Sequence, residues 1–115
     1  MTVRELKEKL GLAVCCGEEN LGREVTGAYI GDLLSDVMAH SQQGQVWITI
    51  QVHVNIVAVA ALKEHAAIII VNGRTPAAET LAKAAEEAMP ILTSGRTAFE
   101  VGGRLHMLGA GGVSE

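Results

Sequence analysis

The sequence predicts an α/β fold in which a mainly parallel sheet is flanked by helices. An apolar run is twice followed by a polar residue, Gly, Arg and Thr, and then by a helical pattern, at residues 68–75 and 90–97. Strand, tight turn and capped helix form the repeating unit of a parallel sheet. Apolar residues make up 49% of the chain but aromatics only 3%. The core must therefore consist of small aliphatic side chains, which suits Rossmann-like layers of helices on a parallel sheet.

The first third of the chain predicts helix, strand, strand and a short helix. Residues 2–11 begin with a Thr-x-x-Glu capping box and end in glycine, the start and stop signals of a helix. Residues 12–16 and 24–30 suit strands on either side of a polar turn. Asp32 is the predicted N-cap of the short helix that follows.

A strand and a helix are expected next. Residues 46–50 are rich in β-branched side chains and carry the only Trp, which favours a strand. Asn55 is the predicted N-cap of a helix over residues 56–65. The isoleucine and valines of that segment also suit a strand, so the helix competes with a second interpretation. Residues 67–71 predict the following strand.

The last two helices carry clear start signals. Thr75 is the predicted cap of one helix, with Pro76 at its first position. Pro90 opens the last strand, where its missing N–H group is tolerated. Thr97 and Glu100 have the spacing of a second capping box.

The chain of 115 residues is expected to form one domain over residues 1–109, with a flexible glycine-rich tail at 110–115. The net charge is -4 and the nine Lys and Arg residues are scattered, which disfavours nucleic-acid binding. The most apolar stretch, residues 46–62, is interrupted by polar residues and falls short of a membrane span. No signal-peptide pattern is present at the start. These features predict a cytoplasmic protein with no membrane partner.

Metal and disulfide chemistry are also disfavoured. Cys15 and Cys16 are adjacent, which suits neither a disulfide framework nor a zinc site. One is expected to be a small core residue and the other exposed. His40, His65 and His106 have no ligand spacing and are expected on solvated helix faces. No metal or cofactor is therefore predicted.

The first candidate binding residues lie in the two Gly-Arg-Thr turns. They are Asn72, Gly73, Arg74 and Thr75 in one turn, and Ser94, Gly95, Arg96 and Thr97 in the other. Glycine lets a backbone approach a ligand, and the helix behind each turn offers unpaired N–H groups. The two arginines can each present a fork to a phosphate or carboxylate, and both can meet one anion if the strands are neighbours. The alternative is ordinary turn and cap chemistry with both arginines in solvent.

A second candidate group is Gln51, His53 and Asn55, which alternate as the chain leaves the Trp47 strand. They should stand near the same edge of the sheet and would suit a sugar, an adenine or an amide. The alternative is a hydrogen-bonded strand exit with a helix cap. No partner carboxylate for His53 is indicated, so general-base catalysis is disfavoured.

The order of several blocks resembles a known family. Residues 2–26 read Thr-Val-x-x-Leu and then Gly-Leu-x-Val-x-x-Gly-Glu-Glu-x-Leu-x-Arg-x-Val-Thr. Residues 46–49, 71–79 and 90–93 continue the likeness. This pattern is similar to the DRTGG domain family and to the non-catalytic amino-terminal domain of HPr kinase/phosphorylase. The resemblance covers essentially the whole chain, although the literal DRTGG string is absent and residues 22–27 are its nearest counterpart.

The resemblance implies a regulatory role with a poorly defined ligand. The kinase half of HPr kinase/phosphorylase and its phosphate loop are absent from this sequence, so we expect no enzyme activity. We expect a non-catalytic regulatory domain that binds a small anionic ligand, a nucleotide or a phosphorylated metabolite, at the carboxyl edge of the sheet. The alternative is an interaction or oligomerisation module without a small ligand. Alanine-rich helices on a small sheet leave apolar surface, which favours a homodimer and admits a protein partner in a signalling or metabolic complex.

Overall fold

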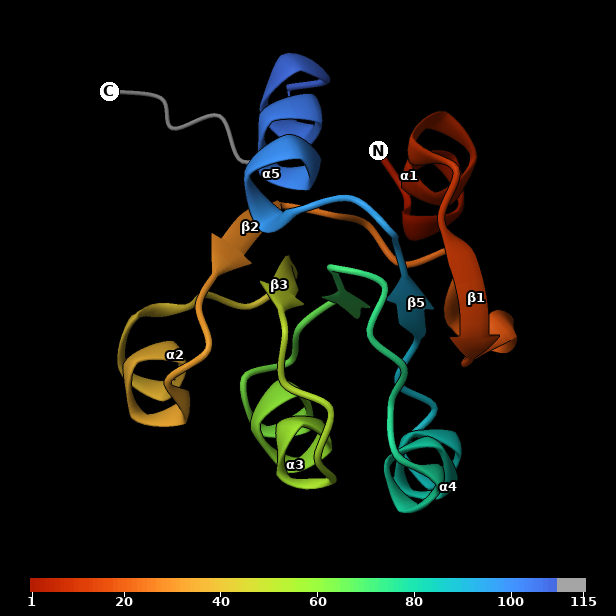
Figure 1. Ribbon diagram of the computed structural model, residues 1–115, viewed down its shortest axis with the longest axis vertical. Coiled ribbons are helices and arrows are strands. Elements are labelled where there is room, and N and C mark those ends of the chain that lie inside the picture. The colour runs from red at the N-terminus through yellow and green to blue at the C-terminus, as the bar shows by residue number, and fades with distance from the viewer. Residues whose placement is uncertain (110–115) are drawn as a thin grey trace.

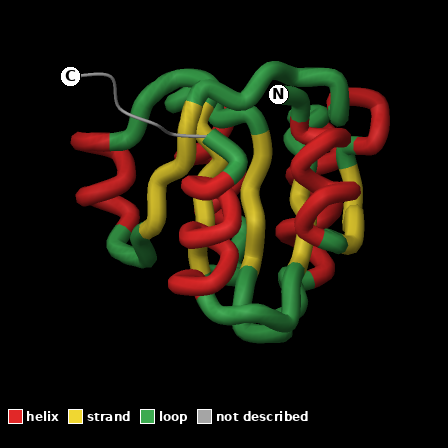
Figure 2. The backbone as a smooth tube through the Cα atoms, turned by 90° about the horizontal axis from the view of Figure 1, so that it is seen from above, coloured by secondary structure: helices red, strands yellow, loops and turns green. Residues whose placement is uncertain are grey.

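The computed structural model describes residues 1–109 as a five-stranded sheet between two layers of helices (Figures 1 and 2). The strand order is β1-β5-β4-β3-β2; β2 to β5 run parallel, and β1 pairs antiparallel with β5. The predicted α/β class is confirmed. In chain order the elements are α1 (Val3–Leu10), β1 (Ala13–Cys16), the 3₁₀ helix η1 (Glu18–Asn20), β2 (Gly27–Ile30), α2 (Leu34–His40), β3 (Gln45–Thr49), α3 (Asn55–Leu62), β4 (Ala67–Ile70), α4 (Ala78–Glu86), β5 (Ile91–Thr93) and α5 (Ala98–Met107).

The sheet buries both of its faces. Helices α1 and α5 cover one face, and α2, α3 and α4 cover the other (Figure 1). Side chains alternate between the two layers along each strand: Val46 and Ile48 pack toward α1 and α5, whereas Trp47 packs toward α2 and α3. Because both faces are covered, β4 is apolar at every position, and all four of its residues are buried.

Two of the predicted helix signals hold in detail. The Thr2 hydroxyl accepts from the Glu5 amide at 3.2 Å, and the Glu5 carboxylate accepts from the Thr2 amide at 2.8 Å, which completes the capping box. Gly11 ends α1 in the left-handed conformation, with φ 66°. At α5 the Thr97 hydroxyl accepts from the Glu100 amide at 3.2 Å.

The predicted cap of α2 is wrong. This helix begins at Leu34 after Leu33 and has no side-chain cap. The Asp32 carboxylate instead accepts from the Thr49 hydroxyl and the Ile50 amide, both at 2.8 Å. Asp32 ties the exit of β2 to the exit of β3, a contact between strands that local spacing does not encode.

The predicted caps of α3 and α4 are also wrong. Asn55 is already the first residue of α3, whose N-cap is Val54. Helix α4 begins two residues later than Thr75-Pro76 predicts, with extended Ala77 as its N-cap. The Ala77 amide donates to the Val52 carbonyl at 3.2 Å, so a contact with the β3–α3 loop holds the chain extended up to the helix.

His65 is buried rather than solvated, at 1% exposure. It follows α3 and precedes β4, where the chain turns back into the sheet. His40 and His106 lie exposed on α2 and α5, as expected. Cys15 is exposed, whereas Cys16 is half-buried and burial raises the pKa of its thiol.

The predicted tail at residues 110–115 lies outside the described residues, and the expected division between residues 1–109 and that tail stays a prediction. None of the helices within residues 1–109 has the length and apolar character needed to cross a bilayer.

Candidate functional site

The carboxyl ends of the four parallel strands meet at one edge of the sheet, where the predicted site residues lie. The β4 and β5 turns are joined there by two backbone hydrogen bonds. The Asn72 amide donates to the Arg96 carbonyl, and the Gly73 amide donates to the Ser94 carbonyl, each at 2.9 Å. Asn72 and Gly73 both adopt left-handed backbone conformations, with φ 63° and 69°. The two Gly-Arg-Thr turns therefore lie side by side.

The loop after β3 joins this pair of turns. Its Val52 carbonyl accepts from the Ala77 amide at 3.2 Å and from the Thr80 hydroxyl at 2.7 Å. Thr80 is fully buried and anchors the start of α4. Three separate segments of the chain, residues 51–55, 72–77 and 94–97, thus form one continuous surface.

The two candidate arginines differ in their surroundings. Arg74 is exposed. Arg96 is half-buried, and its guanidinium donates to the Leu10 carbonyl at 3.2 Å, at the last residue of α1. A cation at a helix C-terminus is favourable because the helix dipole is negative there. Arg96 therefore holds α1 onto the edge of the sheet.

Several of the other predicted side chains are used in local structure. Ser94 is buried and accepts from the Arg96 amide at 3.1 Å. Thr97 caps α5, and the Gln51 side-chain amide donates to the Asp32 carbonyl at 2.9 Å. The predicted residues that the structure leaves exposed are Asn72, Gly73, Arg74, Thr75, Gly95, Thr97, His53 and Asn55.

Replacing Arg96 with methionine should lower the free energy of unfolding by about 1–2 kcal/mol, because it removes a charge-assisted hydrogen bond at the end of α1. The same change at exposed Arg74 should alter stability by less than about 0.5 kcal/mol. Chemical denaturation of both variants measures the difference. Equal effects of the two changes would contradict the structural role of Arg96.

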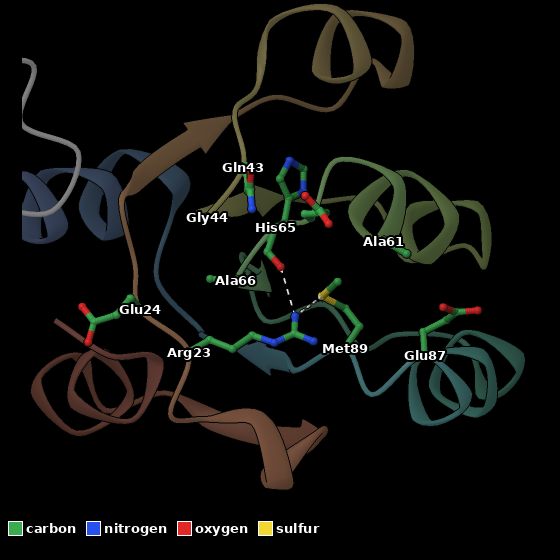
Figure 3. A pocket seen from close by; sticks show the side chains of 10 residues that line it. Arg23, Glu24, Gln43, Gly44, Ala61, His65, Ala66, Glu87 and Met89 are labelled. Carbon is green, nitrogen blue, oxygen red and sulfur yellow. Dashed lines mark hydrogen bonds between the residues drawn. The ribbon is translucent and has the colours of Figure 1, made fainter.

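A separate cavity lies at the opposite edge of the sheet (Figure 3). It has a volume of about 470 Å³. Arg23 crosses its floor and donates to the His65 carbonyl at 3.1 Å and the Ala88 carbonyl at 3.4 Å. Its lining residues are Arg23, Glu24, Gln43, Gly44, Ala61, Glu64, His65, Ala66, Glu87 and Met89. The three glutamates outnumber the one arginine, which makes this cavity unsuited to an anion.

Arg23 was not identified from the sequence, because its partners are main-chain carbonyls far away in the chain. His65 directly follows left-handed Glu64, and Ala88 is itself left-handed. The two residues lie in the turns that lead from α3 and α4 into the sheet. One arginine thus joins both turns. Its role is to tie the segment before β2 to the amino ends of β4 and β5.

The described residues contain no group of three or more His, Cys, Asp or Glu side chains arranged to hold a metal ion. The carboxyl edge offers hydrogen-bond donors and an exposed cation. Oxygen atoms of a ligand accept hydrogen bonds from donors and cations of these kinds.

No protein-family model and no curated protein matches the chain. A solved structure does: the CBS and DRTGG domains of the regulatory region of Clostridium perfringens pyrophosphatase, complexed with the activator diadenosine tetraphosphate. The TM-score is 0.68 at 16% sequence identity, over 90% of this chain. The fold is that of a DRTGG-like domain. The match covers 45% of the length of that solved chain, so this chain corresponds to less than half of it.

Proposed function

We propose that this DRTGG-like domain is a non-catalytic regulatory module that binds a small anionic ligand, a nucleotide or a phosphorylated metabolite, at the carboxyl edge. The observation that carries the proposal is the pair of backbone hydrogen bonds that joins the two turns. It sets the turn of exposed Arg74 beside the turn of Arg96, whose guanidinium donates to the Leu10 carbonyl. The absence of a Walker-type phosphate loop from the sequence supports the non-catalytic role.

Charge distribution favours the β4 and β5 side of the edge for the anionic group. Arg74 and Arg96 lie on that side, whereas the Asp32 carboxylate lies at the exits of β2 and β3. Helix α4 also begins there without a side-chain cap, so the Ala78 and Glu79 N–H groups are available to an oxygen ligand, whereas the Thr80 amide donates to the Ala77 carbonyl and the Glu79 carboxylate adds one negative charge. Exposed His53 and Asn55 follow β3 and would contact a sugar or base.

Nucleotides are the first ligands to test, since the similar regulatory region from Clostridium perfringens was solved with diadenosine tetraphosphate. A regulatory module of this kind would act in the cytoplasm and transmit ligand binding to a partner protein in a signalling or metabolic complex. The cytoplasmic location and the partner protein are parts of the same proposal.

Replacing Arg74 with alanine should weaken binding about tenfold to a hundredfold, because one charge-assisted bond to an anion contributes about 1.5–3 kcal/mol. Calorimetric titration with diadenosine tetraphosphate, ATP and inorganic phosphate measures the change. Arg4→Ala is the matched control, since Arg4 is an exposed arginine in the first turn of α1. Binding that survives Arg74→Ala unchanged, or a wild-type chain that binds none of the three probes, would overturn the proposal.

An interaction module is the second candidate function. It is favoured by the exposed aromatic and methionine side chains of α5, Phe99 and Met107. Arg74 of the ligand edge and Phe99 of α5 are separate exposed side chains, so each surface can be tested by its own variant.

A further inference from the structure

Helix α5 carries an apolar strip on its exposed side. Phe99 is 87% exposed and Met107 is 85% exposed. They are eight residues apart with Gly103 midway, so all three follow one line along the helix. Val101 and Leu105, on the other side of the helix, are buried against the sheet. Helix α5 is therefore apolar toward the core and also along this one line of its solvent side.

An apolar cavity of about 490 Å³ adjoins this strip. It lies between the end of α1 and the length of α5, two helices that cover the same face of the sheet (Figure 1). Gly103 adds no side chain to it, and no atom lies within 4 Å of the position where a side chain would begin. Its lining residues are Lys9, Leu10, Phe99, Glu100, Gly103, Arg104, Met107 and Leu108.

We propose that a second copy of this chain docks on this surface and forms a two-fold dimer. Two protruding side chains and an apolar hollow lie on one face, as an isologous interface requires, because each copy then supplies both the knob and the hole. Two α5 helices packed antiparallel around Gly103 would bring Phe99 of one copy to Met107 of the other. This dimer would form whether or not the carboxyl edge binds a ligand.

The charges beside the strip support pairing with an identical copy. Glu100 and Arg104 each follow a strip residue and so share one flank of α5. Neither belongs to an ion pair among residues 1–109. In an antiparallel pair the same flanks face one another, so Glu100 of one copy approaches Arg104 of the second copy, and the reverse contact forms by symmetry. Opposite charges thus meet at two places in one interface.

The size of the surface sets the expected affinity. A helix of 10 residues is about 15 Å long, and the end of α1 adds Lys9 and Leu10. Such an interface falls at the low end of the specific range, for which a dissociation constant of about 1–10 µM is reasonable. The dimer should therefore dissociate on dilution.

Sedimentation velocity from about 1 to about 200 µM tests the dimer. Phe99→Asp and Met107→Asp should each raise the dissociation constant at least about thirtyfold. Both positions are exposed, so the variants should fold as the parent does, which circular dichroism checks. Leu62→Asp is the matched control: Leu62 is 70% exposed but lies on α3, which covers the other face of the sheet.

A charge exchange tests the antiparallel arrangement independently. Glu100→Arg and Arg104→Glu should each weaken the dimer about fivefold, and the double variant should restore it. A wild-type chain that stays monomeric at 200 µM, or a dimer lost in Leu62→Asp but kept in Phe99→Asp, would overturn the proposal. Failure of the double variant to restore association would overturn the antiparallel pairing of α5.

Discussion

Replacing Gly17 with alanine should destabilise the chain by about 2–5 kcal/mol, since the change adds backbone strain of about 1–2 kcal/mol to a steric clash of about 1–3 kcal/mol. Gly17 is buried between β1 and η1 with φ 81°. A methyl group there would lie 2.5 Å from the Pro90 Cα atom and 2.6 Å from the Pro90 nitrogen. These are main-chain atoms at the entry of β5. Neither the backbone at Gly17 nor the backbone at Pro90 can therefore move away without separating β1 from β5.

Substitutions at two other glycines distinguish the cost of backbone strain from the cost of the steric clash. Gly11 shares the left-handed conformation but has open space around it, so Gly11→Ala should cost only about 1 kcal/mol. Gly22 has open space and no left-handed backbone, so Gly22→Ala should change stability by less than about 0.5 kcal/mol. Denaturant unfolding of the three variants gives the order. A Gly17→Ala variant as stable as Gly22→Ala would contradict the close contact with Pro90.

Lowering the pH from 7.5 to 5 should destabilise the folded chain by about 2 kcal/mol through His65 alone. Burial, assisted by nearby Lys63, lowers the pKa of His65 from 6.5 to about 4. Between these two values the unfolded chain binds more protons than the folded chain. The contribution of His65 to the free energy of unfolding is therefore fully present above pH 6.5. It falls as the pH drops, to a total loss of about 3 kcal/mol below pH 4.

The contacts of His65 explain why it stays neutral. The Ser41 hydroxyl donates its one hydrogen to the Val37 carbonyl at 2.6 Å, so His65 must donate from Nε2 to Ser41 Oγ, at 2.8 Å. Its Nδ1 atom is buried and has no hydrogen-bond partner among the described residues. The ring also packs edge-on against Trp47. A proton on Nδ1 would place a charged donor where nothing accepts it.

The pH effect is measured as a difference between variants. His65→Phe should lose the slope of stability between pH 7.5 and 5 that the wild-type chain shows, whatever its stability at neutral pH. His53→Gln removes an exposed histidine and should keep that slope. Parallel slopes for wild type and His65→Phe would assign the pH dependence to other groups.

The two proposed surfaces meet at one residue. The Leu10 carbonyl accepts from Arg96 of the ligand edge, and Leu10 also lines the cavity beside α5. Arg96 therefore contacts a residue of the α5 surface as well as belonging to the ligand edge. Arg74 belongs to the ligand edge alone. This is why Arg74 is the better variant for testing ligand binding and Phe99 the better one for testing association.

The sequence by itself determined the fold class, the order of the elements and the edge of the sheet at which the two Gly-Arg-Thr turns lie. Apolar runs, glycine punctuation and the Thr2 capping box are local signals, and local hydrogen bonds and burial enforce them. The repeat of Gly-Arg-Thr indicated two turns at the same edge of the sheet, and they are hydrogen-bonded neighbours, although only the first has left-handed residues, Asn72 and Gly73. The order of the blocks indicated a DRTGG-like domain, and the structural match agrees.

Only the tertiary structure decided what each polar side chain does. Asp32 and Thr75 have the spacing of caps, but Asp32 bonds across to the exit of β3, and the chain after Thr75 stays extended because Ala77 bonds to Val52. His65 looks like a surface residue in the sequence but is buried, with its Nε2 atom bonded to Ser41 and its ring against Trp47. Arg74 and Arg96 occupy equivalent places in the repeat, yet only Arg96 reaches the end of α1. The reason is the same in each case: the partner is distant in sequence, and the packing of the sheet alone brings the two groups together.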